Sequence, residues 1–283
     1  MYIYMKVGLI GVGNMGLPLL KRLLNNQYKV NVLLEKNISI TEKCKFFQEN
    51  ELNKFIDYNS VIISVLPNSN ITLNIINNIN NDKKKYWMDL CSSCPKDVTK
   101  INNFLLRQNI EYIDAPVSGG PKGMEKGILT SLVSGPQNTY KKFYDIISIY
   151  SNQIHYVSGD VGTSSTIKLA NNTLLALNLI SAAEILNILE KKNIDIKVSL
   201  DFINNASGRS WATMQRYPDN ILTGKYDYGF SYDLHKKDIL TFINTLDNID
   251  ERFLLTKINE IYNNDDNKIS NNMDHTEIVK LIK

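Results

Sequence analysis

The feature that most constrains the fold is a glycine-rich turn near the start of the chain, within KVGLIGVGNMGLPLLKRLL. Its glycines have the spacing G-x-G-x-x-G, directly after an apolar run and directly before an amphipathic one. Between a strand and a helix, this spacing permits a tight turn, close approach of a pyrophosphate and close packing of helix on strand, and the helix N-terminus attracts phosphates. The alternative is a purely structural turn. The residues of the predicted dinucleotide site are Gly11, Gly13, Asn14, Met15 and Gly16.

The first 160 or so residues alternate short apolar runs with amphipathic segments, which predicts parallel strands joined by crossover helices. The runs are KVGLIGVG, KVNVLL, SVIISVLP, KYWMDL, IEYIDAP, ILTSLVSG and IHYVSG. From Thr163 onward the remainder is typical of helices, with breaks at NIDI, ASGRS, RYPDN and DYGFS. The predicted fold is α/β, with an N-terminal doubly wound Rossmann-type domain at residues 1–162. An all-α C-terminal domain at residues 163–283 follows, and it begins with a long linking helix.

Composition limits the class of protein. The chain has 283 residues, 43% of them hydrophobic and 22% charged, as in ordinary globular proteins. No uninterrupted apolar run approaches the roughly 18 residues of a membrane span, so we expect no transmembrane helix. The net charge of +3 is too small to indicate a nucleic-acid partner. Because the first strand begins right after MYIY, we expect no signal or transit peptide and a cytoplasmic location, with a mitochondrial one as the alternative.

Cysteine and histidine offer little chemistry of their own. Cys91 and Cys94 form CSSCP, which could be a redox pair of the thioredoxin type, but this position inside another fold favours two ordinary thiols. Cys44 stands apart from them. The three histidines are scattered, so no metal site is predicted.

The choice of cofactor depends on the end of the second strand, VNVLLEKN. An acid placed there accepts the ribose hydroxyls of NAD, and Glu35 is the only acid in this stretch. The neighbouring Lys36 could instead hold the 2′-phosphate of NADP. The sequence favours NAD and leaves NADP open.

Further motifs follow the later strands. They are VLPN, with Leu66 and Pro67; DLCSSCP, with Ser92; DAPVSGG; GDVGTSSTIKLANN; and FSYDLHKKDI. The first three lie where open α/β sheets bind ligands, at the carboxyl ends of strands. In this order, and over nearly the whole chain, the motifs resemble those of the β-hydroxyacid dehydrogenase family.

The resemblance implies a role for individual residues. Lys168 matches the catalytic lysine of the family, and Asn172 matches the asparagine that helps to position the substrate. Lys237 matches a lysine that closes over the site, supported by Asp238. The substrate loop, which holds a carboxylate, corresponds to Ser118, Gly119 and Gly120, and apolar walls correspond to Trp211 and Phe230.

Two departures from the family pattern concern the cofactor. Where the family has D-x-S-T-x-x-P, Ser92 replaces the threonine near the nicotinamide ribose, and Cys91 takes the serine position. Glu35 lies one residue later than the acid of NAD-preferring members, which puts the cofactor preference in doubt.

Lys168 suits the chemistry that the resemblance implies. Transfer of a hydride from a hydroxyl to nicotinamide leaves a proton for a base to accept. A lysine pKa of about 10.4 must fall by roughly 3 units, or about 4 kcal/mol, to serve near neutral pH. Lys168 is the only charged residue between Asp160 and Glu184, an apolar setting that penalises the ammonium form. Asn172, four residues on, shares its helix face.

Plainer interpretations exist for each of these residues. Lys168 could snorkel from a half-buried helix, VSGG could be a simple turn, Trp211 and Phe230 could be core residues, and Lys237 could be surface charge.

Three functions compete. The first is hydride transfer between NAD(P) and a short β-hydroxy acid or its semialdehyde, and the second is a non-enzymatic scaffold that keeps the fold. The third, a decarboxylating sugar-phosphate relative, normally has a longer helical domain. A helix over residues 164–191 would extend for about 40 Å. That length predicts a homodimer or homotetramer in which the helix packs against a partner subunit.

Overall fold

The computed structural model describes residues 5–34, 44–249, 252–264 and 273–282. The chain divides into two compact units, Met1–Lys168 (unit 1) and Leu169–Lys283 (unit 2). The sequence places the boundary before Thr163, six residues earlier. The difference arises because the first turn of the long helix is hydrogen-bonded to the end of a strand in unit 1, as described below.

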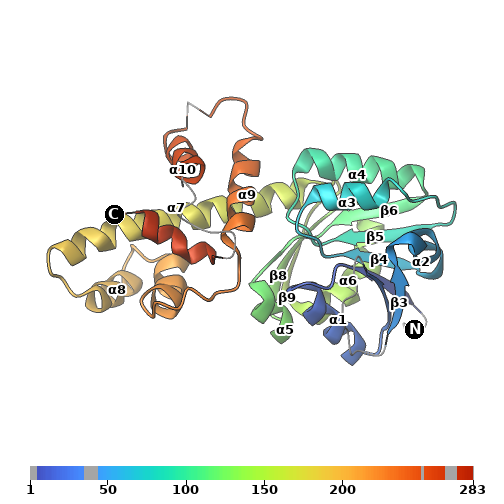
Figure 1. Ribbon diagram of the computed structural model, residues 1–283, viewed down its shortest axis with the longest axis horizontal. Coiled ribbons are helices and arrows are strands. Elements are labelled where there is room, and N and C mark those ends of the chain that lie inside the picture. The colour runs from blue at the N-terminus through green and yellow to red at the C-terminus, as the bar shows by residue number, and fades with distance from the viewer. Residues whose placement is uncertain (1–4, 35–43, 250–251, 265–272, 283) are drawn as a thin grey trace. The chain divides into compact units, whose positions relative to one another are not determined.

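Unit 1 is a single sheet covered by helices on both faces (Figure 1). Its strands are β1 (Lys6–Ile10), β2 (Lys29–Leu34), β3 (Lys45–Gln48), β4 (Val61–Ser64), β5 (Lys85–Asp89), β6 (Ile110–Asp114), β7 (Val117–Ser118), β8 (Leu129–Ser134) and β9 (Ser151–Ser158). Its helices are α1 (Gly16–Asn25), η1 (Glu49–Glu51), α2 (Leu52–Tyr58), α3 (Ser69–Ile76), α4 (Pro95–Arg107), α5 (Gly120–Lys126) and α6 (Gln137–Tyr150).

The sheet has the doubly wound topology that the alternating pattern predicts. The strand order is β3-β2-β1-β4-β5-β6-β8-β7, and β9 pairs with β8. Strands β1 to β6 are parallel to one another, whereas β8 is antiparallel to β6 and β7. The seven predicted apolar runs are all strands. The sequence missed β3 and β7 because β3 has four residues, β7 has two, and neither is a long apolar run.

Each face of the sheet has its own core, because successive strand residues point to opposite sides. On one face, Val7 and Leu9 of β1 pack with apolar residues of α1, α5 and α6. On the other, Ile10 and Ile62 pack with α2, α3 and α4. Figure 1 shows these two helical layers. The loops at the carboxyl ends of the parallel strands therefore stand on a rigid support.

Unit 2 is helical over the residues that the structure describes. Its elements are α7 (Thr163–Lys191, whose first six residues belong to unit 1), α8 (Ile196–Asn205), η2 (Ala212–Ile221), α9 (Tyr232–Ile243), α10 (Phe253–Asn263) and η3 (His275–Leu281). Ala176 and Leu179 of α7 pack against α9, α10 and η3, and Ala183 and Leu186 pack with Leu200 and Tyr217. α7 is thus the central helix of this unit.

One predicted break is wrong. The sequence predicts a helix break at RYPDN. Instead, η2 is a π-helix that extends from Ala212 to Ile221 and contains Pro218. The wider turn of a π-helix, with its i→i+5 bonds, tolerates a residue that disrupts the i→i+4 pattern.

α7 also differs from the expectation about membrane spans. By length and composition alone it could cross a membrane, and a third of its most apolar window is buried. Uninterrupted apolar runs in α7 are short, because Asn, Thr and Ser separate its apolar residues. Core helices of water-soluble proteins have the same property, and α7 supplies residues to both cores of unit 2.

Candidate active site

The loops predicted to bind the dinucleotide and the substrate lie at one edge of the sheet in unit 1. The glycine turn follows β1, VLPN follows β4, DLCSSCP follows β5, and DAPVSGG follows β6. β1 pairs with β2 on one side and with β4 on the other, so the chain direction of the crossovers reverses there. Such a switch point is where open α/β sheets bind their ligands.

The glycine turn has the geometry that its spacing predicts. Gly11 has φ +89°, and a Cβ atom there would lie 2.3 Å from the Val65 carbonyl oxygen. A Cβ atom on Gly16 would lie 1.9 Å from the Gly11 carbonyl oxygen, whereas one on Gly13 would meet nothing within 4 Å. The side chain of Met15, the N-cap residue of α1, makes no capping hydrogen bond, and the first turn of this helix contains no acid. Open space beside Gly13 and an uncapped helix end fit a pyrophosphate.

Gly13 and Gly16 should therefore respond differently to alanine. Gly13→Ala should fold normally but raise the Kd for NAD(P)H by about tenfold or more, roughly 1.4 kcal/mol, because the methyl group fills the approach of the pyrophosphate. Gly16→Ala should instead lower thermal stability, because its methyl group overlaps the Gly11 carbonyl. Fluorescence titration with NADH and NADPH and thermal unfolding distinguish the two effects. Wild-type affinity in Gly13→Ala would contradict the assigned site.

Leu66 and Ser92, predicted at the cofactor site, lie on neighbouring loops that Cys91 connects. The Leu66 amide donates to Cys91 Sγ at 3.3 Å, and the Cys91 amide donates to Asp89 Oδ1 at 3.1 Å. Leu66 is buried, Ser92 half-buried and Pro67 exposed. Burial, together with the nearby Asp89, raises the pKa of the Cys91 thiol well above its ordinary value. Cys91 and Cys94 are free thiols, and the burial of Cys91 favours the interpretation as two ordinary thiols over a redox pair.

A cavity of about 910 Å³ is lined by residues near the ends of β2 and β3, at the start of α2 and on α3. No sequence motif marks this cavity, because its polar lining consists of ordinary surface residues such as Gln48, Asn50 and Asn74. Glu35, the predicted partner of the ribose, lies outside the described residues, as does Lys36.

The predicted substrate loop stands at the start of α5. Ser118 ends β7 and is half-buried, Gly119 has φ +126°, and Gly120 has φ +66°. Both glycines have positive φ angles, which residues with a side chain rarely adopt. The backbone conformation therefore explains why two glycines stand together here.

The first turn of α7 is anchored by Asp114, the first residue of DAPVSGG. Its buried carboxylate accepts hydrogen bonds from five groups of unit 1. They are Ser134 Oγ (2.6 Å), Gly162 N (3.0 Å), Ser164 Oγ (2.5 Å), Ser165 N (3.1 Å) and Ser165 Oγ (3.0 Å). Lys168, which is 8% exposed, follows on the same helix. One residue thus ties the loop predicted to bind substrate to the helix that carries the predicted base.

Sequence reasoning missed Asp114. Asp114 precedes Ser164 by 50 residues, so no pattern close to Lys168 along the chain indicates it. The run of hydroxyl residues in GTSST was the available signal, because serines and threonines at a helix start often mark a capping arrangement.

In unit 2, the structure brings together Asn172, Lys237 and Asp238. Asn172 Nδ2 donates to Asp238 Oδ2 at 2.7 Å, and Lys237 Nζ lies 2.9 Å from Asp238 Oδ1. Asn172 and Asp238 are buried, and the Lys237 side chain is only 28% exposed, so Lys237 is not an ordinary surface charge. This cluster agrees with the support that the sequence assigned to Asp238.

The two predicted apolar walls differ. Trp211 is 57% exposed, so the alternative that it is a core residue is wrong. Phe230 is half-buried, and its ring packs against the rings of His235 and His275 at 5.3 and 5.4 Å between centroids. Neither observation assigns a ligand to these side chains.

A C-terminal segment holds the loop that carries Phe230. Asp274 Oδ2 accepts from the amides of Gly229 and Phe230, at 2.8 and 3.2 Å, and the His275 amide donates to the Phe230 carbonyl at 2.8 Å. Burial alone would raise the pKa of Asp274, but hydrogen bonds from His275 and Thr276 hold that pKa well below its ordinary value. Burial lowers the pKa of His275.

Among the described residues, no three His, Cys, Asp or Glu side chains are grouped so that they could bind a metal ion.

These two shifts predict a loss of stability in acid. For both groups the unfolded chain binds protons more readily than the folded one. The folded state therefore loses stability as the pH drops below about 6.5, because of His275, and loses more below about 4, because of Asp274. Asp274→Asn should cost about 1–3 kcal/mol at pH 7, and the difference from wild type should shrink toward pH 3. Thermal unfolding at both pH values measures this difference. A deficit that stays constant with pH would contradict the assignment to the Asp274 charge.

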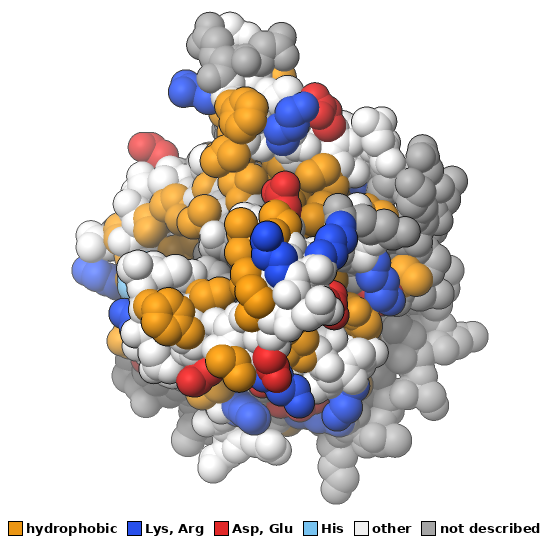
Figure 2. Space-filling model, turned by 90° about the vertical axis from the view of Figure 1, so that its left-hand side faces the viewer, with side chains coloured by type: hydrophobic (Ala, Val, Ile, Leu, Met, Phe, Trp, Pro, Cys, Tyr) orange, Lys and Arg blue, Asp and Glu red, His pale blue; other side chains and the backbone are white. Residues whose placement is uncertain are grey.

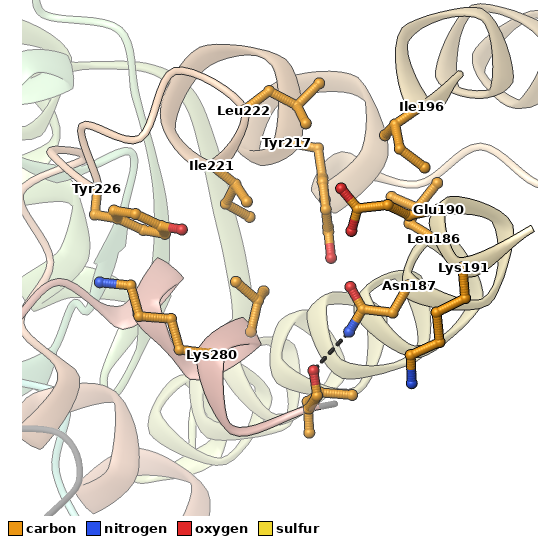
Figure 3. Close-up of a pocket in the computed structure, with 12 residues that line it drawn as sticks. Leu186, Asn187, Glu190, Lys191, Ile196, Tyr217, Ile221, Leu222, Tyr226 and Lys280 are labelled. Atoms are coloured by element: carbon orange, nitrogen blue, oxygen red, sulfur yellow. Dashed lines mark hydrogen bonds between the residues drawn. The ribbon is translucent and has the colours of Figure 1, made fainter. Parts of the chain in front are cut away.

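A second cavity, of about 680 Å³, lies within unit 2 between α7, η2 and η3 (Figure 3). Tyr217 and Glu190 point into it, Lys280 lies 4.1 Å from the Tyr226 ring centre, and Asn187 Nδ2 donates to the Ile282 carbonyl. None of the predicted site residues lines this cavity.

Comparison with known proteins covers both units. Residues 6–159 match the family model described as the NAD binding domain of 6-phosphogluconate dehydrogenase. Residues 162–282 match the model described as NAD-binding of NADP-dependent 3-hydroxyisobutyrate dehydrogenase.

Individual relatives agree. The chain is 30% identical to 2-(hydroxymethyl)glutarate dehydrogenase of Eubacterium barkeri, over 83% of this chain and 80% of the relative. It is 27% identical to the mitochondrial 3-hydroxyisobutyrate dehydrogenase of Drosophila melanogaster, over 82% and 75%. The fold matches the structure of Mycobacterium tuberculosis 3-hydroxyisobutyrate dehydrogenase with L-serine, at a TM-score of 0.87, 19% identity and 99% coverage of both chains.

Proposed function

The chain belongs to the β-hydroxyacid dehydrogenase family, and we propose that it interconverts a short β-hydroxy acid and its semialdehyde, as a 3-hydroxyisobutyrate dehydrogenase does. It is an NAD(P)-dependent hydroxyacid dehydrogenase. The names of its relatives suggest two kinds of substrate, a monocarboxylate such as 3-hydroxyisobutyrate and a dicarboxylate such as 2-(hydroxymethyl)glutarate.

Lys168 is the proposed general acid/base, and the observation that carries the proposal is its burial on a helix anchored at Asp114. An apolar setting destabilises the charged ammonium form of a lysine, so loss of its proton costs less free energy there than in water. When bound, NAD(P) supplies the hydride acceptor. Lys168 Nζ would take the proton of the substrate hydroxyl, and Asn172 would donate to the substrate oxygen from the same helix face.

The remaining residues are proposed to bind rather than react. Ser118, with the amides of Gly119 and Gly120, would hold the substrate carboxylate, and Lys237 would close over the bound substrate and cofactor. Trp211 and Phe230 would form apolar walls. The glycine turn, Leu66, Pro67 and Ser92 would bind the cofactor, with Glu35 at its ribose. The 910 Å³ cavity would receive the adenosine end. The proposed cofactor is NAD, with NADP as the alternative.

One panel tests this function and the cofactor together. Purified protein is assayed by nicotinamide absorbance with 3-hydroxyisobutyrate, 2-(hydroxymethyl)glutarate, glycerate, 4-hydroxybutyrate and threonate, each with NAD and with NADP, and in reverse with the oxo partners. We expect turnover with at least one pair. No turnover with any pair would contradict the proposal and favour the alternative, a non-enzymatic scaffold that keeps the fold.

Self-association is also proposed, as a homodimer or homotetramer. The exposed apolar side chains of α7, α8 and η2 include Leu174, Ile185, Ile188, Val198, Phe202 and Met214. Figure 2 shows a face of the molecule on which apolar side chains gather among scattered charges. A second copy would cover such a surface, since monomers rarely expose large apolar patches. A monomer in size-exclusion chromatography with light scattering would contradict this proposal.

For location we propose the cytoplasm, without membrane or nucleic-acid partners, and mitochondria are the alternative because several relatives carry that word in their names. Fractionation of cells that express the full protein decides between the two compartments.

A further inference from the structure

His235, on α9, is a fully buried histidine that contacts the backbone of Asn172. Its Nε2 lies 3.1 Å from the Asn172 carbonyl oxygen, and its Nδ1 lies 3.3 Å from the hydroxyl of Tyr262. A carbonyl oxygen can only accept, so Nε2 carries the proton and donates it. In the neutral ring, Nδ1 then accepts from the Tyr262 hydroxyl. The Asn172 carbonyl therefore selects the tautomer with which α9 binds α7, and the Tyr262 hydroxyl on α10 supplies the second hydrogen bond of the ring.

α9 holds Asn172 at a second point. Asp238 lies three residues after His235, on the same face of α9, and its Oδ2 accepts from Asn172 Nδ2 at 2.7 Å. An ionised carboxylate accepts only, so the NH₂ group of Asn172 must face Asp238. Asn171 Nδ2 donates to Asn172 Oδ1 at 3.2 Å, which completes the orientation of the amide. The second N–H of that NH₂ group is the one with which Asn172 can reach a substrate oxygen.

The ring of His235 has little freedom to leave this position. The ring centroid of His275 lies 5.1 Å away, that of Phe230 5.3 Å and that of Tyr262 6.1 Å. All four side chains belong to unit 2. The contacts at the backbone and at the side chain of Asn172 are thus set by one packed cluster.

We propose that His235 is a positioning residue for hydride transfer: by donating to the Asn172 carbonyl it fixes α9 on α7, so that Asp238 presents the Asn172 amide in one orientation. This inference rests on the proposed function, in which Asn172 binds the substrate oxygen. Tyr262 supports the same arrangement, because its hydroxyl donates to Nδ1 and so helps to hold the His235 ring in place.

The test compares kcat and KM of His235→Phe, His235→Gln, Tyr262→Phe, Asn172→Ala and the double variant His235→Phe/Asn172→Ala, with the best substrate of the panel. His235→Phe keeps a ring but cannot donate, and we expect kcat to fall roughly 10- to 100-fold, the range for a misplacement of about 1 Å. The Kd for NAD(P)H should not change, because the glycine turn lies in unit 1. His235→Gln can place an N–H near the position of Nε2 and should recover most of kcat.

The double variant separates positioning from general loss of structure. If His235 acts through Asn172, adding His235→Phe to Asn172→Ala should lower kcat by no more than about twofold. An equal fall in both backgrounds would overturn the inference, as would wild-type kcat in His235→Phe. If His235→Phe does not fold, Tyr262→Phe, which removes one hydroxyl, should lower kcat about 2- to 10-fold, and unchanged kcat there would overturn it. Wild-type kcat in Asn172→Ala would instead refute the role that the proposed function gives to Asn172.

Discussion

Replacing Lys168 by alanine should lower kcat by roughly 10²- to 10⁴-fold, the usual contribution of a general acid or base. Without the amine, no group on this face of α7 can take the proton of the substrate hydroxyl, because the next charged residues along the chain are Asp160 and Glu184. The Kd for NAD(P)H should stay within about twofold of wild type, since the phosphates are bound at the glycine turn. Steady-state kinetics and NADH fluorescence measure the two quantities.

Lys168→Arg separates catalysis from the snorkelling alternative. Arginine keeps the charge and a long stem but cannot lose its proton in the working pH range, so this variant should be as inactive as alanine. A lysine that only extends to solvent would be replaced by arginine without loss. Lys192→Ala, at an exposed position just beyond α7, is the matched control and should retain wild-type kcat. Full turnover in Lys168→Ala would refute the assigned role.

The fold could be predicted from local patterns because its main elements are long, apolar and regular. The glycine turn and seven apolar runs identified the doubly wound sheet, and the loss of the strand pattern after Thr163 identified the helical part. What the sequence missed was short or unusual: β3, β7 and the π-helical stretch around Pro218. A strand of two to four residues gives no periodic signal.

The site was predicted less completely, because its supporting contacts join residues far apart in sequence. Asp114 meets Ser164 across 50 residues, His235 meets Asn172 across 63, and Asp274 meets Gly229 across 45. A single sequence does not reveal such pairs. It identified residues with distinctive motifs, such as Lys168, and it could not identify those that hold them. No carboxylate lies near Lys168 along the chain, as the sequence predicts. In the folded protein, however, the Asp114 carboxylate binds the first turn of the same helix.

Asp114→Ala should destabilise unit 1 strongly, by about 3–5 kcal/mol. The carboxylate accepts from three hydroxyls and two backbone amides, all of which are buried. Alanine leaves them without an acceptor and removes the negative charge that the N-terminus of α7 favours. At 2–4 °C per kcal/mol for a unit of this size, the midpoint of thermal unfolding should fall by roughly 6–20 °C. Calorimetry or circular dichroism measures the shift.

Asp114→Asn and Asp145→Ala make this interpretation specific. Asparagine keeps the volume and one acceptor oxygen, but its NH₂ group would face donors such as the Ser165 amide. The thermal midpoint of Asp114→Asn should therefore lie between those of Asp114→Ala and the wild type. Asp145, exposed on α6, should tolerate alanine with less than about 0.5 kcal/mol of change. Because Asp114 also anchors the helix that carries Lys168, kcat should fall in both Asp114 variants even at temperatures where they remain folded. A thermal midpoint for Asp114→Ala equal to that of Asp145→Ala would show that the α7 N-terminus does not depend on this carboxylate.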